Sequence, residues 1–293
     1  MDWKRPLTAV AILVAGLGSY VLAQSAAQLT LWQAYESGAY TYDVLFESLP
    51  WLLPGAVAVG LFLGAVRARG ADTQPETRSG KVKRHRAWGW FLEHWTLATG
   101  MVVLLASGIW LGFLFVPQQA AGPEGVGLAL NVHWAGAAIL LFAVAYHLGG
   151  LVMGVHRELL PSSSDVGNAI RDIGHYVGLT EQPPAGKYKP IQRVSYLAWA
   201  GIILVLAISG LVKAVDYVGT VGGGLKSSMT LVHEVFALLA VLMFVGHVGI
   251  VFIPSHLQLL RSQITGWIPQ SYVRKHHPEW LPDASREFAH EDD

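Results

Sequence analysis

Two stretches of this sequence decide its fold: VHWAGAAILLFAVAYH at 132–147 and VHEVFALLAVLMFVGH at 232–247. Each holds one histidine near its start and another at its end, so the pairs His133/His147 and His233/His247 are both 14 residues apart. Fourteen residues of α-helix rise about 21 Å and complete nearly four turns, so both histidines of a pair face almost the same way. The repeated spacing predicts two membrane helices with histidines at two levels of a hydrocarbon layer about 30 Å thick.

Composition identifies the class of protein. Of the 293 residues, 53% are hydrophobic and 14% are charged, whereas soluble domains have roughly 45 to 50% apolar and 25% charged residues. The mean hydropathy is +0.41, which indicates an integral membrane protein. The formal net charge is +0 and the basic residues are spread over several short loops, so nucleic-acid binding is excluded.

The chain contains no cysteine. Disulfides, a covalently attached c-type haem and cysteine-ligated iron–sulfur clusters are therefore excluded for this chain. Any haem must be held by histidine, and any iron–sulfur relay must belong to a partner.

The hydrophobic segments predict an all-α transmembrane protein. Each is close to the roughly 20 residues needed to span a membrane. Residues 1–86 are expected to form a two-helix N-terminal membrane extension with a basic cytoplasmic linker, and residues 87–293 a four-helix domain with a cytoplasmic tail. A short surface helix capped by Ser164 or Asp165 is expected in the loop after the fourth segment. The six segments are 7–27, 49–66, 90–116, 131–154, 194–215 and 229–253.

The basic residues orient these helices. With the N-terminus in the cytoplasm, Lys213 and Lys226 are the two of the 20 lysines and arginines that fall outside. The positive-inside rule therefore predicts a multi-pass protein of a bacterial-type inner membrane with both termini cytoplasmic. The alternative is that the first segment is a cleaved signal ending near Val21-Leu-Ala23, which leaves the other helices in the same orientation.

The histidine pairs predict haem ligation. One membrane histidine is often only hydrogen-bonded between helices, but nothing in helix packing requires two parallel pairs at the same spacing. We interpret the pattern as a transmembrane dihaem cytochrome b with two non-covalent haem b groups. His133 and His233 are the candidates at the outer level, whereas the inner level has three candidates for two positions: His94, His147 and His247.

The remaining histidines lie outside the predicted spans or at their edges. Solvated surface positions are expected for them. They are His85, His156, His175, His256, His276, His277 and His290.

In these features the chain resembles the cytochrome b subunit, called gamma, of membrane-bound formate dehydrogenase, which is related to the cytochrome b subunits of respiratory hydrogenases and thiosulfate reductases. The resemblance covers about residues 87–280. The matching elements, in order, are His94-Trp95, His133, Gly186-Lys-Tyr188 with Gln192, His233 with His247, and Lys275-His-His-Pro-Glu-Trp280.

The resemblance implies a four-helix dihaem bundle that carries electrons between a partner and quinone. It implies His133 with His233 as outer haem ligands and His94 with His247 as inner ligands. An iron–sulfur subunit attached to a catalytic dehydrogenase or reductase is implied on the outer face, and quinone reduction beside the inner haem. His147 is additional to this ligand set, and on spacing alone it is an equally good partner for His247.

The quinone is expected at the cytoplasmic end of the bundle. The Gly186-Lys-Tyr188 segment and the end of the last helix both lie on that side, which places Lys189, Gln192 and His256 near the head group. The family commonly has asparagine where Lys189 stands, so the quinone contacts differ in detail. Whether the quinone is menaquinone or ubiquinone is left open.

Other functions remain as alternatives. A hydrogenase or a quinol-oxidising reductase is the alternative partner, because the partner's substrate never touches this chain. A proton-linked transporter that uses the histidines as a relay, or a haem-free anchor, represents another class. The chain is expected to have no catalytic residues and no substrate site except that for quinone. It is expected to contact membrane lipid. The sequence does not decide whether the complex forms homo-oligomers.

Overall fold

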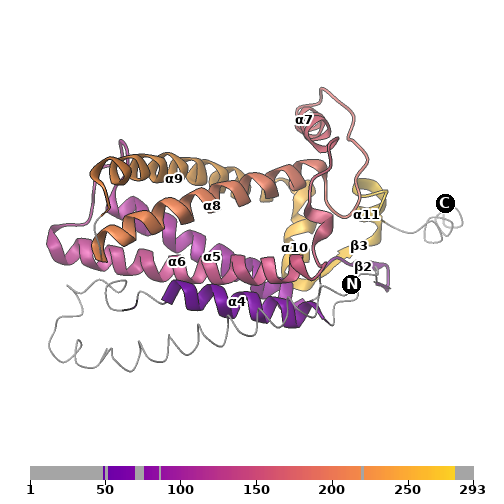
Figure 1. The fold of residues 1–293 in the computed structure, drawn as a ribbon. Coiled ribbons are helices and arrows are strands. Elements are labelled where there is room, and N and C mark those ends of the chain that lie inside the picture. The colour runs from indigo at the N-terminus through magenta and orange to yellow at the C-terminus, as the bar shows by residue number, and fades with distance from the viewer. Residues whose placement is uncertain (1–48, 50–51, 70–75, 86, 219–220, 281–293) are drawn as a thin grey trace, which may run out of the picture. The chain divides into compact units, whose positions relative to one another are not determined.

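The computed structural model describes residue 49 and residues 52–69, 76–85, 87–218 and 221–280. Within this part of the chain, four helices are long and apolar enough to cross a membrane, which confirms the predicted all-α transmembrane fold. They are α5 (Ala87–Leu111), α6 (Gly122–Val152), α8 (Pro190–Val218) and α9 (Gly223–Val251), all visible in Figure 1. The predicted segment 7–27 lies outside the described residues.

Helix α6 begins earlier than hydropathy predicts. Its start at Gly122 precedes the predicted start at 131 by nine residues, with Pro123 in the first positions and Glu124 in the first turn. Proline there lacks only a donor that has no helical partner, and an acidic side chain is favourable at a helix N-terminus. The helix therefore extends beyond its apolar segment.

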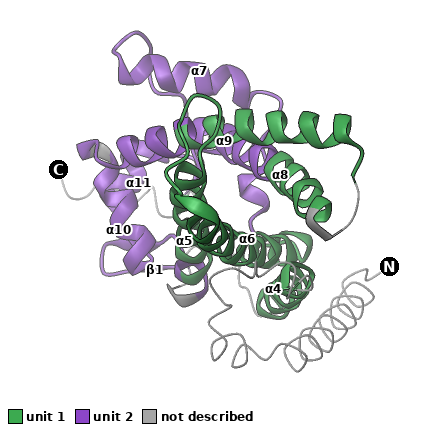
Figure 2. Cartoon of the chain, turned by 90° about the vertical axis from the view of Figure 1, so that its left-hand side faces the viewer, with its two compact units in different colours: residues 1–71, 92–155, 204–241 green, residues 72–91, 156–203, 242–293 purple. Residues whose placement is uncertain are grey.

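The chain divides into two compact units, coloured separately in Figure 2. The first comprises residues 1–71, 92–155 and 204–241, and the second comprises residues 72–91, 156–203 and 242–293. Helices α5, α8 and α9 contribute residues to both units. The domain boundary predicted at residue 86 stays a prediction.

In the first unit, the apolar helix α4 (Leu52–Ala68) packs along α6 through small residues. A side chain at Gly60 or Gly64 would collide with the backbone of α6, and one at Gly149 would collide with the carbonyl of Leu61. Membrane helices pack closely where glycine removes the side chain from the interface. Glycine at these positions therefore permits the close approach of α4 and α6.

The second unit contains a small antiparallel sheet that the sequence did not predict. Strands β1 (Thr77–Arg78), β2 (Lys81–Lys83) and β3 (Trp267–Pro269) lie in the order β1-β2-β3. Val82 pairs with Ile268, and both side chains are fully buried. Strands of two or three residues are too short to show a period of two in the sequence, so the sequence alone predicts a linker here.

Short helices complete the second unit. The predicted surface helix is present as α7 (Asp165–Tyr176), but Ser164 makes no side-chain cap bond; instead Asp165 accepts a hydrogen bond from the backbone N–H of Ser162 at 2.5 Å. The other helices are η2 (Arg157–Leu159), η3 (Pro254–His256), α10 (Leu257–Thr265) and α11 (Gln270–His276).

Candidate haem-binding site

The first unit brings the two predicted outer ligands together. The rings of His133 on α6 and His233 on α9 have their centroids 6.3 Å apart and their planes at 63°. Two imidazoles on opposite sides of one metal ion, each bonded at about 2 Å, have centroids roughly 6 Å apart. The spacing of the rings is therefore compatible with both histidines binding one metal ion.

A serine on the neighbouring helix fixes the tautomer of His133. The Oγ atom of Ser107 donates to the carbonyl of Val103 at 2.7 Å and lies 2.9 Å from Nδ1 of His133. A hydroxyl has one proton, so once this proton is given to the carbonyl, the oxygen accepts from Nδ1–H. Nε2 then carries the lone pair that binds a metal.

The same arrangement recurs at His233. Ser209 on α8 donates to the carbonyl of Val205 at 2.7 Å, and its Oγ lies 2.9 Å from Nδ1 of His233. Each serine is followed by a glycine, Gly108 on α5 and Gly210 on α8. Two helix pairs thus present two imidazoles in the same tautomer.

The glycines leave room beside the imidazoles. A Cβ atom at Gly210 would lie 3.1 Å from Cε1 of His233, and one at Gly108 would lie 3.8 Å from Cε1 of His133. Gly100 and Gly136, in contrast, lie against α6 and α5 and are explained by helix packing alone. The donor set, the tautomers and the ring spacing together fit haem b, with His133 and His233 as the residues that would hold it.

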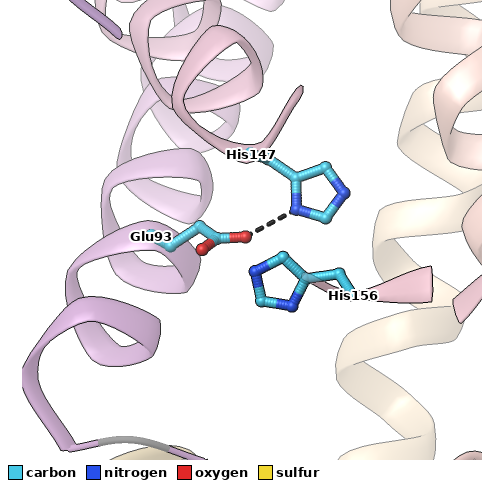
Figure 3. Close-up of side chains that lie close together, drawn as sticks. All are labelled: Glu93, His147 and His156. Carbon is cyan, nitrogen blue, oxygen red and sulfur yellow. Dashed lines mark hydrogen bonds and ion pairs between the residues drawn. The ribbon is translucent and has the colours of Figure 1, made fainter. Parts of the chain in front are cut away.

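At the other level of the first unit, His147 on α6 is bonded to a buried carboxylate. Figure 3 shows Glu93 of α5 pointing toward His147, with Oε1 2.6 Å from Nδ1. Arg67 at the end of α4 lies 3.6 Å from the other carboxylate oxygen. A metal-binding histidine commonly gives its second nitrogen to a carboxylate, so the contact is compatible with His147 either as an inner ligand or as a residue that binds no metal.

The other two inner candidates, His94 and His247, belong to different units. His94, next to Glu93, is half-buried and meets the ring of Trp95 edge to face at 5.4 Å. His247 belongs to the second unit. The choice between His94 and His147 as its partner stays a prediction.

The second unit places Lys189 and His256 in one hydrogen-bonded chain through Tyr176. Nδ1 of His256 lies 2.9 Å from the carbonyl of Ile250, so it carries the proton and Nε2 accepts. The hydroxyl of Tyr176 lies 2.8 Å from Nε2 and receives Nζ of Lys189 at 3.4 Å. The chain of donors therefore runs from Lys189 through Tyr176 to His256.

Gln192 and Asp172 hold the start of α8. The side-chain oxygen of Gln192 accepts from the backbone N–H of Lys189 at 2.9 Å, three residues before it, as in half of a capping box. Asp172 of α7 accepts from the N–H of Ile191 at 3.3 Å. Both satisfy donors of the kind that have no partner inside a helix.

Burial sets the protonation of this chain of groups. It lowers the pKa of His256, and the carbonyl of Ile250 opposes this effect. It also lowers the pKa of Lys189, which Asp172 opposes, and it raises the pKa of Tyr176 to about 12. At neutral pH the imidazole of His256 is therefore an uncharged acceptor beside a neutral phenol.

Three histidines expected at the surface are buried, so that prediction is wrong for His85, His256 and His277, which are 5%, 6% and 1% exposed. His85 stacks on Trp90, with centroids 4.3 Å apart. His277 donates from Nδ1 to the carbonyl of Gly186 at 2.8 Å. His175 is exposed as expected, and His290 lies outside the described residues.

The sequence interpretation missed the groups that orient the candidate ligands and the proposed quinone site. Glu93 and Tyr176 carry no local signal, because their partners are 54 and 80 residues away. Ser107 and Ser209, in contrast, carry a signal in the sequence. The Ser-Gly pair recurs on the helix before each candidate outer ligand.

The geometry agrees with comparisons to known proteins. The family model of prokaryotic cytochrome b561 matches residues 94–266, more than half of the chain. No curated protein matches the chain. The matched region contains all four membrane-length helices apart from the first residues of α5. The chain therefore belongs to the prokaryotic cytochrome b561 family and is a multi-pass membrane protein that carries electrons with haem b.

Proposed function

We propose that this chain is the membrane subunit that takes electrons from an iron–sulfur and dehydrogenase partner on the outer face and passes them to quinone at the cytoplasmic side. The observation that supports this most is the pair His133 and His233, each tethered through Nδ1 so that Nε2 is available to iron. The resemblance to formate dehydrogenase gamma subunits supports the direction and the partner.

The chain is proposed to hold two haem b groups, which supply one-electron redox chemistry when bound. His133 and His233 would hold the outer one, and His247 with His94 or His147 the inner one. Ser107 and Ser209 orient the outer imidazoles. The contribution of the chain is ligation, spacing and a low dielectric.

Quinone is proposed to bind near Lys189, Gln192 and His256. A quinone that is reduced to quinol takes up two protons, and a cytoplasmic site would take them from the cytoplasm. Lys189 and Tyr176 offer donors in one continuous chain that ends at His256. Because Gln192 already accepts from the N–H of Lys189, its amide NH₂ group is the part that would contact a quinone oxygen.

The proposed sidedness has an energetic consequence. Electrons that arrive from outside and protons that arrive from inside separate charge across the membrane. Moving one charge through the membrane potential corresponds to about 2.3 kcal/mol per 100 mV. Quinone reduction at this face would therefore conserve energy, and a site at the outer face would not.

Spectroscopy and subunit identification test this proposal. The reduced, purified protein should show a b-type α-band with two haems per chain. Acid–acetone should extract all haem, because no cysteine can hold it covalently. Absence of the band would remove the cytochrome assignment, and one haem per chain would remove the two-haem path. The subunits that co-purify distinguish a formate dehydrogenase from a hydrogenase or a quinol-oxidising reductase.

A further inference from the structure

Helix α7 turns an aliphatic face outward and a carboxylate face inward. Asp165 and Asp172 are 0% and 1% exposed, whereas the four aliphatic side chains are more than half exposed. A spacing of four, three and four residues puts these four on one side of a helix. They are Val166, Ile170, Ile173 and Val177, at 61%, 66%, 54% and 66% exposure.

The inward face fixes α7 to the ends of two membrane helices. Asp165 pairs with Arg193 in the first turn of α8 at 2.5 Å, and Asp172 accepts from the N–H of Ile191. Tyr176 bonds to His256, five residues beyond the end of α9. Because α8 and α9 are membrane-length helices, these bonds hold α7 at the membrane boundary.

The outward face has the composition of a lipid contact. Its four residues are all aliphatic, whereas the centres of protein interfaces are enriched in tyrosine, tryptophan and arginine. Arg171 within α7 and Arg157, eight residues before the start of the helix, are exposed, and positive side chains beside an apolar helix face attract anionic headgroups. The positive-inside orientation puts this surface against the cytoplasmic leaflet.

We propose that α7 is an interfacial helix whose Val166, Ile170, Ile173 and Val177 face is buried in the cytoplasmic leaflet of the bilayer. The helix is then anchored from two sides, by lipid on its aliphatic face and by Asp165 and Asp172 on its protein face. Such helices lie in the membrane plane with the apolar side some 5–10 Å into the headgroup and acyl boundary.

The absence of cysteine makes a direct test available. Ile170→Cys gives a unique attachment point for a nitroxide spin label in the otherwise complete protein. The labelled protein, with its haem, is placed in nanodiscs of phosphatidylcholine and phosphatidylglycerol. Power saturation then compares collisions with oxygen, which enters lipid, and with a polar nickel chelate, which does not.

Leu204→Cys, at a 60% exposed position in the middle of α8, serves as the lipid control, and Glu181→Cys, in the exposed loop after α7, as the water control. The label at Ile170 should resemble the lipid control, with high oxygen and low nickel accessibility. Val177→Cys, one helical turn beyond Ile173, should give the same result if the first variant folds poorly.

Two outcomes overturn the proposal. High nickel accessibility at Ile170 and Val177 means that the face is in water. Low accessibility to both reagents means that a protein, either a partner or a second copy of this chain, covers it. Neither outcome depends on the number of haems or on quinone, so failure here is distinct from failure of the proposed electron path.

Discussion

The Oγ atom of Ser209 lies 2.9 Å from Nδ1 of His233 and is oriented by its own bond to the carbonyl of Val205. Ser209→Ala removes the acceptor of the Nδ1–H proton. The imidazole then donates less electron density, so the outer haem should be held about 10 to 100-fold more weakly and its reduction potential should rise.

Potentiometric titration of the reduced-minus-oxidised spectrum measures this potential, and haem retention during dilution in detergent measures the affinity. Ser227→Ala, at an exposed position on the same helix as His233, is the matched control. An unchanged potential in both Ser209→Ala and Ser107→Ala would contradict the tautomer argument.

Replacing an outer ligand should remove one haem and leave the other. His133→Ala or His233→Ala leaves the outer iron with one protein ligand, so haem content should fall from two to about one per chain. The pyridine haemochrome assay measures this content, with His175→Ala, an exposed histidine, as control. Retention of both haems in either variant would refute the outer assignment.

The inner ligand is tested by two parallel substitutions. We expect His94→Ala to lose the inner haem and His147→Ala to keep it, because the family resemblance favours His94. Haem content and the α-band maximum report the result. Loss of the inner haem only in His147→Ala would identify His147 as the ligand.

Substitutions in the hydrogen-bonded series that joins Lys189, Tyr176 and His256 should slow quinone reduction while both haems stay bound. Lys189→Ala removes the first donor, and Tyr176→Phe removes the hydroxyl that connects it to His256. The expected loss is on the order of 10² to 10⁴-fold in the rate of haem reoxidation by quinone, the range for removal of a positioned proton donor.

Stopped-flow spectroscopy measures that rate, and Arg274→Ala removes an exposed charge elsewhere in the second unit as control. A quinone-analogue inhibitor should shift the inner-haem spectrum selectively. If it instead shifts the haem held by His133 and His233, the quinone site is on the opposite face.

Burial of His277 makes stability dependent on pH. Burial lowers its pKa to about 3, whereas in the unfolded chain it should titrate near 6.5. Between these values only the unfolded state takes up the proton, so stability is complete above pH 6.5 and falls as pH decreases toward 3, by about 1.4 kcal/mol per pH unit.

Thermal unfolding in detergent at several pH values measures this slope. His277→Asn keeps a donor for the carbonyl of Gly186 but does not titrate. The dependence of its stability on pH should therefore be weaker than that of the wild type by the contribution of one proton, about 1.4 kcal/mol per pH unit. His175→Asn, at an exposed site, should keep the original slope. Equal slopes for wild type and His277→Asn would show that this histidine is not the group responsible.

The sequence predicted the four membrane-length spans well because each is predominantly apolar over more than the roughly 20 residues needed to cross a membrane. It missed the buried state of His277 and His85, because that burial depends on a sheet joining Val82 to Ile268, 186 residues away. No local pattern encodes such a contact. For the outer site, spacing identified the histidines, whereas the serines that orient them lie 26 and 24 residues away.

The contact between Arg67 and Glu93 has an evolutionary consequence. Arg67 lies at the end of α4, in the predicted N-terminal extension, Glu93 lies in α5, and the carboxylate is 6% exposed. A chain that lost the extension would keep the buried acid and its bond to His147 but lose the nearby guanidinium, which makes the carboxylate costlier to bury. Related chains without the extension should therefore have a neutral residue at the position of Glu93, and the two features should be inherited together.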